Sequence, residues 1–307
     1  MFKFCKKTAL LLLVSLYSLT TSVEAQKIFV ADLSLKDSAS VTNNISVLAD
    51  RALSVFASNS KSDLYDGLFR LQIVAGKYEA ALSSIDSIRS VYSSQPISDL
   101  AQVGFPYEVY SRASIAKSHS SKDFPFLIDS VTAAVYKRIL PDSRAELENY
   151  LSVSPADLSV RYAKLLSQLV PVNSDSVDLS DIYRICKTYN SLLVMSVMKS
   201  RMQQLITDDE NSKYVFLDSL LIPMKDGGTL SAVMVKKRSV SARRPVILMY
   251  NIYAGPSDRA AAKEMADHGY IGVVVNTRGK FLSKDAILPF EHDANDAYEM
   301  IDYLSRH

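Results

Sequence analysis

Apolar residues recur at helical spacing through the first two thirds of the chain, from Asn44 to about Gln204. Positions three and four apart lie on one face of an α-helix, so this spacing predicts a series of amphipathic helices. Two of them are expected over 123–139 and 156–169, and another begins after Asn44, a candidate N-cap. The apolar residues of that helix are Ile45, Leu48, Ala52, Val55 and Phe56.

One segment, near residues 63–93, predicts a helical hairpin. Gly76 is suited to end the first helix, and Tyr78 and Ala81 are placed to pack the second helix against it. The stretch 68–82 resembles the turn between the two helices of a tetratricopeptide repeat. No second copy with the same glycine and tyrosine follows at a period of about 34 residues. A plain helical bundle, an irregular array of hairpins and a repeat solenoid therefore all remain open.

The pattern changes at the polar stretch 208–212. Only three of the nine glycines precede residue 220, and glycine is typical of the turns in strand-loop-helix folds. After the polar stretch, β-forming residues predict strands over 214–223 and 229–236, joined by a glycine-containing turn. The sequence therefore predicts a mainly α-helical domain over 26–208, followed by a second domain of a different class over 213–307.

The second domain continues with strands that alternate with helices. Continuous apolar runs at 245–250 and 271–275 predict fully buried strands, and a short helix is expected between them over 259–267. This order predicts parallel strands joined by a right-handed crossover. A further amphipathic helix is expected over 293–304. Its predicted apolar face consists of Ala297, Met300, Ile301 and Leu304.

Residues 1–25 have the three parts of a secretory signal peptide. Three lysines lie within the first seven residues, an apolar run extends to Leu19, and small residues precede a cleavage site after Ala25. The apolar run is shorter than the roughly 20 residues of a membrane span. We therefore expect export to the periplasm or the cell exterior, loss of Cys5 with the signal peptide, and no membrane attachment of the mature chain.

Charge and cysteine content narrow the function classes. The chain has 35 basic and 33 acidic residues, and the expected mature chain is close to neutral. Nucleic-acid binding is not expected, because it requires a clustered basic surface. Cys186 would be the single cysteine of the mature chain, which leaves no intrachain disulfide, and we interpret it as a core residue. His119 lies in a polar stretch and is interpreted as a surface residue of a loop.

Five motifs follow one another between residues 214 and 307. They are 222–227 (Ile-Pro-Met-Lys-Asp-Gly), 245–253, His268-Gly269-Tyr270, Asn276-Thr277-Arg278-Gly279, and Pro289-Phe290 followed by Asp293 and Asp296. In order and spacing they resemble the Xaa-Pro dipeptidyl-peptidase-like serine hydrolases, a group that includes cocaine esterase. The resemblance implies an α/β-hydrolase domain that cleaves an acyl ester, or a peptide or amide bond, through an acyl-enzyme and without a cofactor.

The resemblance also implies where the active-site residues lie. A serine nucleophile on a strand-to-helix turn, an aspartate and a histidine are expected in that order, all beyond His307. No G-x-S-x-G segment occurs in the sequence. We therefore expect a domain that is incomplete before the nucleophile, and a chain that is inactive as given. Tyr253 matches the tyrosine that donates to the oxyanion in this family, although packing over the sheet edge is an alternative role for it.

The chain departs from the family pattern at several positions. Asn276 stands where the family usually has aspartate, and Ile252 stands where it usually has proline. The segment Ser283-Lys284-Asp285 replaces a common serine-glutamate-glycine sequence. These departures leave the substrate and the subfamily open.

The remaining polar residues of this region are interpreted as structural. His268 precedes a glycine at a helix end, where its imidazole is expected to cap backbone carbonyls. His292 lacks the convergent neighbours of a metal site, and Asp293 and Asp296 are expected in the first turn of a helix. Arg278 is expected to form an ion pair with one of these aspartates.

Two hypotheses of different class follow. The first is an exported serine hydrolase with an additional helical domain, acting on a small ester or peptide substrate. The second is a helical protein-interaction module that carries a relic hydrolase segment. A protein partner at the helical domain is compatible with both.

Overall fold

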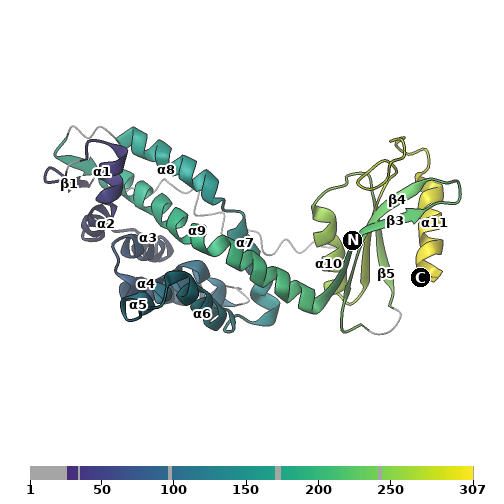
Figure 1. Ribbon diagram of the computed structural model, residues 1–307, viewed down its shortest axis with the longest axis horizontal. Coiled ribbons are helices and arrows are strands. Elements are labelled where there is room, and N and C mark those ends of the chain that lie inside the picture. The colour runs from purple at the N-terminus through teal and green to yellow at the C-terminus, as the bar shows by residue number, and fades with distance from the viewer. Residues whose placement is uncertain (1–25, 34, 96–98, 170–173, 241–243, 307) are drawn as a thin grey trace. The chain divides into compact units, whose positions relative to one another are not determined.

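The computed structural model describes residues 26–33, 35–95, 99–169, 174–240 and 244–306 (Figure 1). The chain divides into two compact units, with unit 1 ending at Ile206 and unit 2 beginning at Thr207. The expected signal peptide, residues 1–25, lies outside the described residues. No helix in the described ranges is both long and apolar enough to cross a membrane.

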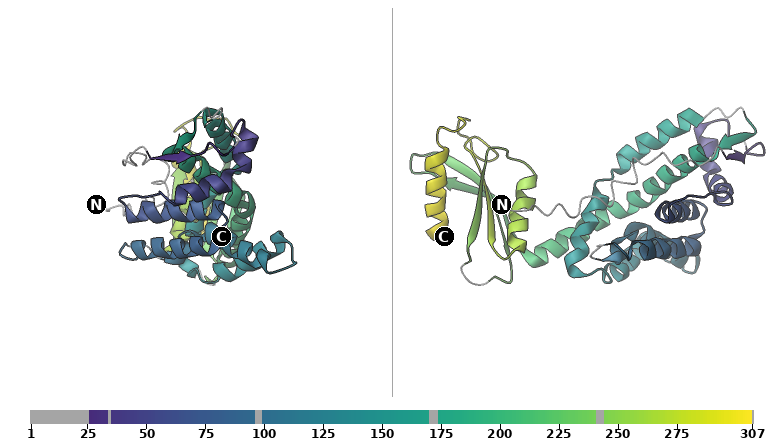
Figure 2. Two further views of the ribbon diagram at one scale, coloured as in Figure 1. Left: turned by 90° about the vertical axis from the view of Figure 1, so that its left-hand side faces the viewer. Right: turned by 180° about the vertical axis from the view of Figure 1, so that it is seen from behind.

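Unit 1 is mainly helical, as its sequence pattern predicts (Figure 2). Its α-helices are α1 (Ser38–Asn43), α2 (Ile45–Leu53), α3 (Lys61–Val74), α4 (Tyr78–Tyr92), α5 (Phe105–Ser118), α6 (Phe124–Tyr136), α7 (Glu148–Leu151), α8 (Pro155–Leu169) and most of α9 (Leu179–Lys213). Two short 3-10 helices span Leu100–Gln102 and Pro141–Leu147. The strands β1 (Lys27–Phe29) and β2 (Ser176–Asp178) form a small antiparallel sheet that the sequence pattern does not predict.

Side-chain caps explain where several of these helices begin. Asp37, Ser60 and Asp123 each accept a hydrogen bond from a backbone N–H in the first turn of α1, α3 and α6. Asn44 does precede α2, but its predicted capping role is wrong. Its side-chain amide donates to the carbonyl of Ser40, because Asn44 also ends the preceding helix.

The predicted hairpin is present as α3 and α4. Gly76 has a positive φ of 76°, which a residue with a side chain rarely adopts, and the N–H of Lys77 closes the helix end on the carbonyl of Gln72. Ala81 is fully buried in the same core cluster as Phe69 and Ile73 of the first helix. The hairpin therefore follows from local chemistry.

The core of unit 1 consists of two clusters. One gathers around α5, α6 and α9, and includes the fully buried Met198 and Met202 of α9. The other lies among α1, α2, α8 and the first half of α9 and includes Cys186. Burial raises the pKa of the Cys186 thiol, so this cysteine stays protonated and serves as a core residue, as expected.

The polar stretch 208–212 is helical, which the sequence pattern does not predict. Helix α9 continues through it to Lys213, and strand β3 begins at the next residue. The stretch is stabilised within unit 2, where the carboxylate of Glu210 accepts a hydrogen bond of 2.5 Å from Lys263. Charged residues are typical of solvated helix faces, and so a polar run alone does not end a helix.

Unit 2 contains a four-stranded sheet in the order β3-β4-β6-β5. Its elements are β3 (Tyr214–Pro223), β4 (Thr229–Lys237), β5 (Val246–Asn251), α10 (Ser257–Asp267), β6 (Ile271–Asn276) and α11 (Asp293–Arg306). Strand β4 pairs antiparallel with both β3 and β6, and β5 pairs parallel with β6. The predicted antiparallel opening pair and the predicted parallel pair are therefore both present.

Helices α10 and α11 cover opposite faces of the sheet (Figure 1). Val273 and Val275 of β6 pack on the side of Met300 in α11, whereas Val274 packs on the side of Ala262 in α10. Gly272 allows α10 to approach closely, because a Cβ atom there would lie 2.0 Å from the backbone oxygen of Ala262.

Two expectations about burial in unit 2 are wrong. Strand β5 is only half buried, and Ile247 and Met249 are about 40% exposed. It is an edge strand, and α10 packs over β4 and β6 and not over β5. On α11 the side chain of Ile301 is 59% exposed, because the buried face runs through Asp296 and Met300.

Candidate functional site

Polar residues gather at the end of the sheet that is formed by the carboxyl ends of β5 and β6. Asn251 and Asn276 are paired at the last position of the two strands, and the N–H of Thr277 donates to the carbonyl of Asn251. The antiparallel strands bring Thr229, the first residue of β4, to the same end of the sheet. Catalytic and binding residues of α/β proteins lie characteristically outside the carboxyl ends of parallel strands.

Tyr253 lies on the loop after β5, and its side chain is 80% exposed. Asn251 fixes its backbone: the side-chain oxygen accepts the N–H of Tyr253 at 2.8 Å, and the side-chain amide donates to its carbonyl at 3.0 Å. The ring therefore projects from a fixed backbone and does not pack over the sheet edge. With the N–H engaged, the hydroxyl is the donor that Tyr253 can offer to a ligand.

A buried pair, Asp258 and Asn276, supports the same loop from behind. The carboxylate of Asp258 accepts hydrogen bonds from the side-chain amide of Asn276, at 3.0 Å, and from the N–H of Gly255, at 3.3 Å. Both side chains are almost fully buried, and the side-chain oxygen of Asn276 has no partner among the described residues. An aspartate at position 276 would place two carboxylates together, so the amide found here suits its neighbour. Sequence reasoning noted Asn276 as a departure but did not identify this partner.

Arg278 forms the ion pair that the sequence predicts. Its guanidinium donates to both carboxylate oxygens of Asp296, at 2.8 and 2.5 Å, and to Asp226 at 3.0 Å. The hydrogen bonds that Arg278 donates to Asp296 and Asp226 raise the pKa of its guanidinium above the ordinary value, and its side chain is only 12% exposed. Arg278 therefore ties the end of β6 to the β3–β4 turn and to the first turn of α11.

The segment Ser283 to Asp285 closes the next loop by hydrogen bonding. Asp285 accepts from the N–H and the hydroxyl of Thr229, at 2.7 and 2.8 Å, and from the hydroxyl of Ser283. The Ser283 hydroxyl also accepts the N–H of Gly279 at 2.8 Å. Hydrogen bonds from Thr229 lower the pKa of Asp285. These contacts make Ser283 a structural residue of the loop.

The histidines contribute no acid-base pair within the described residues. His268 ends α10, and its Nδ1 lies 2.8 Å from the carbonyl oxygen of Glu264, which confirms the predicted cap. His119 is exposed after α5, as expected. His292 precedes α11, and its carbonyl accepts the N–H of Asp296. None of these three imidazoles hydrogen-bonds a serine.

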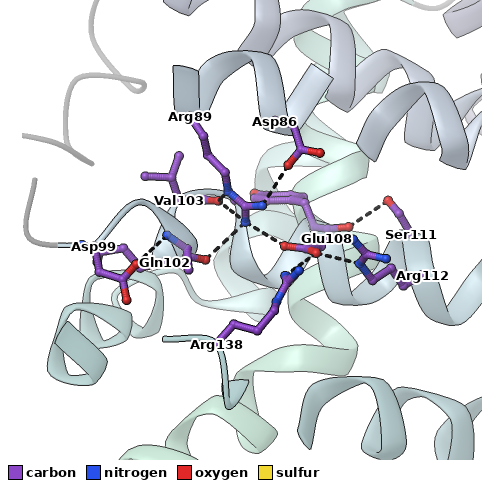
Figure 3. Close-up of polar contacts among 12 residues, drawn as sticks. Asp86, Arg89, Asp99, Gln102, Val103, Glu108, Ser111, Arg112 and Arg138 are labelled. Carbon is purple, nitrogen blue, oxygen red and sulfur yellow. Dashed lines mark hydrogen bonds and ion pairs between the residues drawn. The ribbon is translucent and has the colours of Figure 1, made fainter. Parts of the chain in front are cut away.

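Within the described residues of unit 1, a cluster of polar side chains is centred on Glu108 of α5 (Figure 3). Its carboxylate is 1% exposed and accepts hydrogen bonds from Arg89, Arg112 and Arg138. Burial raises the pKa of Glu108, but attraction to Arg89 and the hydrogen bonds from the arginines outweigh it and lower the pKa. Sequence reasoning missed this cluster; the spacing of four residues between Glu108 and Arg112 is its one local signal.

The comparisons with known proteins bear on unit 2. Residues 226–307 match the family model of the X-Pro dipeptidyl-peptidase (S15 family), and the resemblance stated from the motifs is confirmed over this range. The matched range contains Tyr253, Asp258, Asn276 and Arg278. No curated protein matches the chain.

Proposed function

Because residues 226–307 are similar to the X-Pro dipeptidyl-peptidase (S15 family), we propose that this chain is part of an exported serine hydrolase. The reaction is cleavage of an acyl ester, or of a peptide or amide bond, through an acyl-enzyme. The observation that carries the proposal is the exposed Tyr253 on a fixed loop at the carboxyl end of β5, within the matched range.

Tyr253 has a specific chemical role in this proposal. When a nucleophile attacks an acyl carbon, the carbonyl oxygen gains negative charge, and a preorganised donor stabilises that charge in the transition state. The Tyr253 hydroxyl donates one hydrogen bond to this oxygen. Asn251 and Asp258 keep the loop in place, so the donor needs little reorganisation during the reaction.

The nucleophile is not assigned to a residue of this sequence. Acyl transfer by this mechanism requires a serine, a histidine that accepts its proton, and an acid that orients the histidine. Residues 1–307 contain no G-x-S-x-G segment, and Ser283 is held by Asp285 and Gly279. The contribution proposed for residues 226–307 is therefore an oxyanion donor and the sheet edge that holds it.

Labelling of the native gene product tests the proposal. The protein is isolated from its source with an antibody against the helical unit and is treated with a fluorophosphonate, which reacts with activated serines. We expect one labelled serine per chain, and we expect labelling to be slowed when an aryl ester is present in excess as a competing substrate. An unlabelled protein that is folded by circular dichroism would show that the chain is not part of a serine hydrolase.

Export is a separate element of the proposal. It is supported by the lysines, the apolar run and the small-residue cleavage pattern that ends at Ala25. Sequencing of the N-terminus of the native protein is expected to begin at Gln26. A mature N-terminus at Met1 would contradict export through this segment.

A further inference from the structure

The cluster around Glu108 brings two half-exposed arginines to one buried oxygen. The Oε1 atom of Glu108 accepts a hydrogen bond from Nε of Arg112 at 2.6 Å and from Nη2 of Arg138 at 2.5 Å. The other oxygen, Oε2, accepts from Nη2 of Arg89 at 2.7 Å. Because they share Oε1, the Arg112 and Arg138 guanidinium groups lie close together, although they come from α5 and from the turn after α6.

Among the described residues, the cluster contains more positive than negative charge. Three arginines contact the single carboxylate of Glu108, and the other acidic contact is Asp86, which pairs with Arg89 at 3.2 Å. Asp99 is the remaining acidic side chain labelled in Figure 3. It accepts backbone N–H groups of Ala101 and Leu140 and contacts none of the arginines.

The Arg89 side chain is largely buried, whereas the side chains of Arg112 and Arg138 are partly exposed to solvent. The Arg89 side chain is 13% exposed and also donates to the backbone carbonyls of Ala101 and Val103. Arg112 and Arg138 are 43% and 47% exposed, and within the described residues each donates only to Glu108. Their remaining N–H groups face solvent from neighbouring positions.

We propose that Arg112 and Arg138 together form a binding site for an oxyanion group, a carboxylate or a phosphate, of a ligand or partner of the helical unit. Guanidinium groups match the planar arrangement of carboxylate and phosphate oxygens and form short, charge-assisted hydrogen bonds with them. Glu108 fixes both groups before a ligand arrives, which lowers the entropic cost of binding. The bound anion also compensates the excess positive charge of the cluster. The site belongs to unit 1 and is independent of the proposed hydrolase chemistry.

Isothermal titration of the full chain at low ionic strength tests the site. Inorganic phosphate and acetate are the two probes, and they distinguish the two sources of the oxyanion. We expect saturable binding of at least one probe, and affinity about tenfold lower in Arg112→Gln and in Arg138→Gln, because each variant removes one charged donor. Arg112→Lys keeps the charge but loses the planar fork, and it is expected to lie between the wild type and Arg112→Gln.

Arg161→Gln is the matched control, since Arg161 is an exposed arginine on α8 with no ion pair among the described residues. It is expected to bind like the wild type. Far-UV circular dichroism establishes that each variant is folded. Absence of binding by the wild type, or equal loss of affinity in Arg161→Gln, would overturn the proposal, because the anion would then respond only to overall charge.

Discussion

The two units use arginine in opposite ways, around Glu108 in unit 1 and around Arg278 in unit 2. In unit 1, one buried carboxylate accepts hydrogen bonds from three arginines, and two of these arginines keep N–H donors that face solvent. In unit 2, one arginine donates hydrogen bonds to two carboxylates, and the side chain of this arginine is 12% exposed. The closed arrangement of Arg278 is suited to connecting segments of the fold. The open arrangement of Arg112 and Arg138 leaves charge for a ligand.

The largest change in the free energy of unfolding is expected for Glu108→Gln. The neutral side chain leaves three arginines together without their shared anion, and breaking a buried ion pair on one side typically costs about 3–5 kcal/mol. Urea-induced unfolding followed by far-UV circular dichroism measures the loss. Glu79→Gln, which changes an exposed glutamate in the first turn of α4, is the control and is expected to change the free energy of unfolding little. Equal stability of Glu108→Gln and the wild type would show that the cluster contributes nothing to folding.

Arg278→Gln is expected to be next in size. It leaves the buried carboxylate of Asp296 without its bidentate partner, at a cost of about 2–4 kcal/mol. Hydrogen exchange of the β6 and α11 peptides measures the local loss of protection. Asp226→Asn removes the exposed partner of the same arginine and is expected to have little effect. If both variants lose protection equally, burial does not distinguish the two carboxylates.

Asn276→Asp tests the buried pair behind the Tyr253 loop. A second carboxylate against Asp258 is expected to destabilise unit 2 by about 1–3 kcal/mol at neutral pH, because two adjacent buried carboxylates cannot both ionise cheaply. Protonation of one of the two relieves the repulsion, so the difference from the wild type is expected to shrink as the pH falls. A variant that is as stable as the wild type at neutral pH would mean that positions 258 and 276 are not in contact.

The smallest expected effect is the dependence of the stability of unit 1 on pH. The pKa of Glu108 is lowered in the folded state, so its ionised form contributes stability that is present above the unfolded pKa of about 4.3. This contribution is lost as the pH falls through the folded pKa. The stability difference between the wild type and Glu108→Gln is therefore expected to be constant near neutral pH and to narrow below about pH 4. A difference that is independent of pH down to this range would contradict the lowered pKa.

Local signals predict most of the fold. The strands of unit 2 are short runs of β-forming residues bounded by turns, and the helix pattern of unit 1 is periodic, so both are visible in the sequence. The local sequence of a strand does not show whether distant segments of the chain cover that strand. The run at 245–250 is apolar throughout, yet β5 lies at the sheet edge and is half exposed. Strands β1 and β2 were missed because three residues are too few to show a period.

The candidate site divides in the same way. Arg278 and Tyr253 belong to recognisable motifs, so the ion pair of Arg278 and the position of Tyr253 on its loop were predictable. The pair of Asp258 and Asn276 joins residues 18 positions apart, and Arg138 lies 30 positions from Glu108. Such contacts depend on how helices and strands pack and leave no periodic signal in the sequence.

The most direct test of the proposed function compares two tyrosine variants of the native gene product in hydrolysis of an aryl ester. Tyr253→Phe removes the proposed oxyanion donor. Tyr270→Phe removes the hydroxyl of a partly exposed tyrosine that precedes β6, at the other end of the strands. We expect kcat to fall by about 10²- to 10³-fold in Tyr253→Phe with little change in KM, and both constants to be unchanged in Tyr270→Phe. Full activity of Tyr253→Phe would contradict the role assigned to this residue and to the loop that holds it.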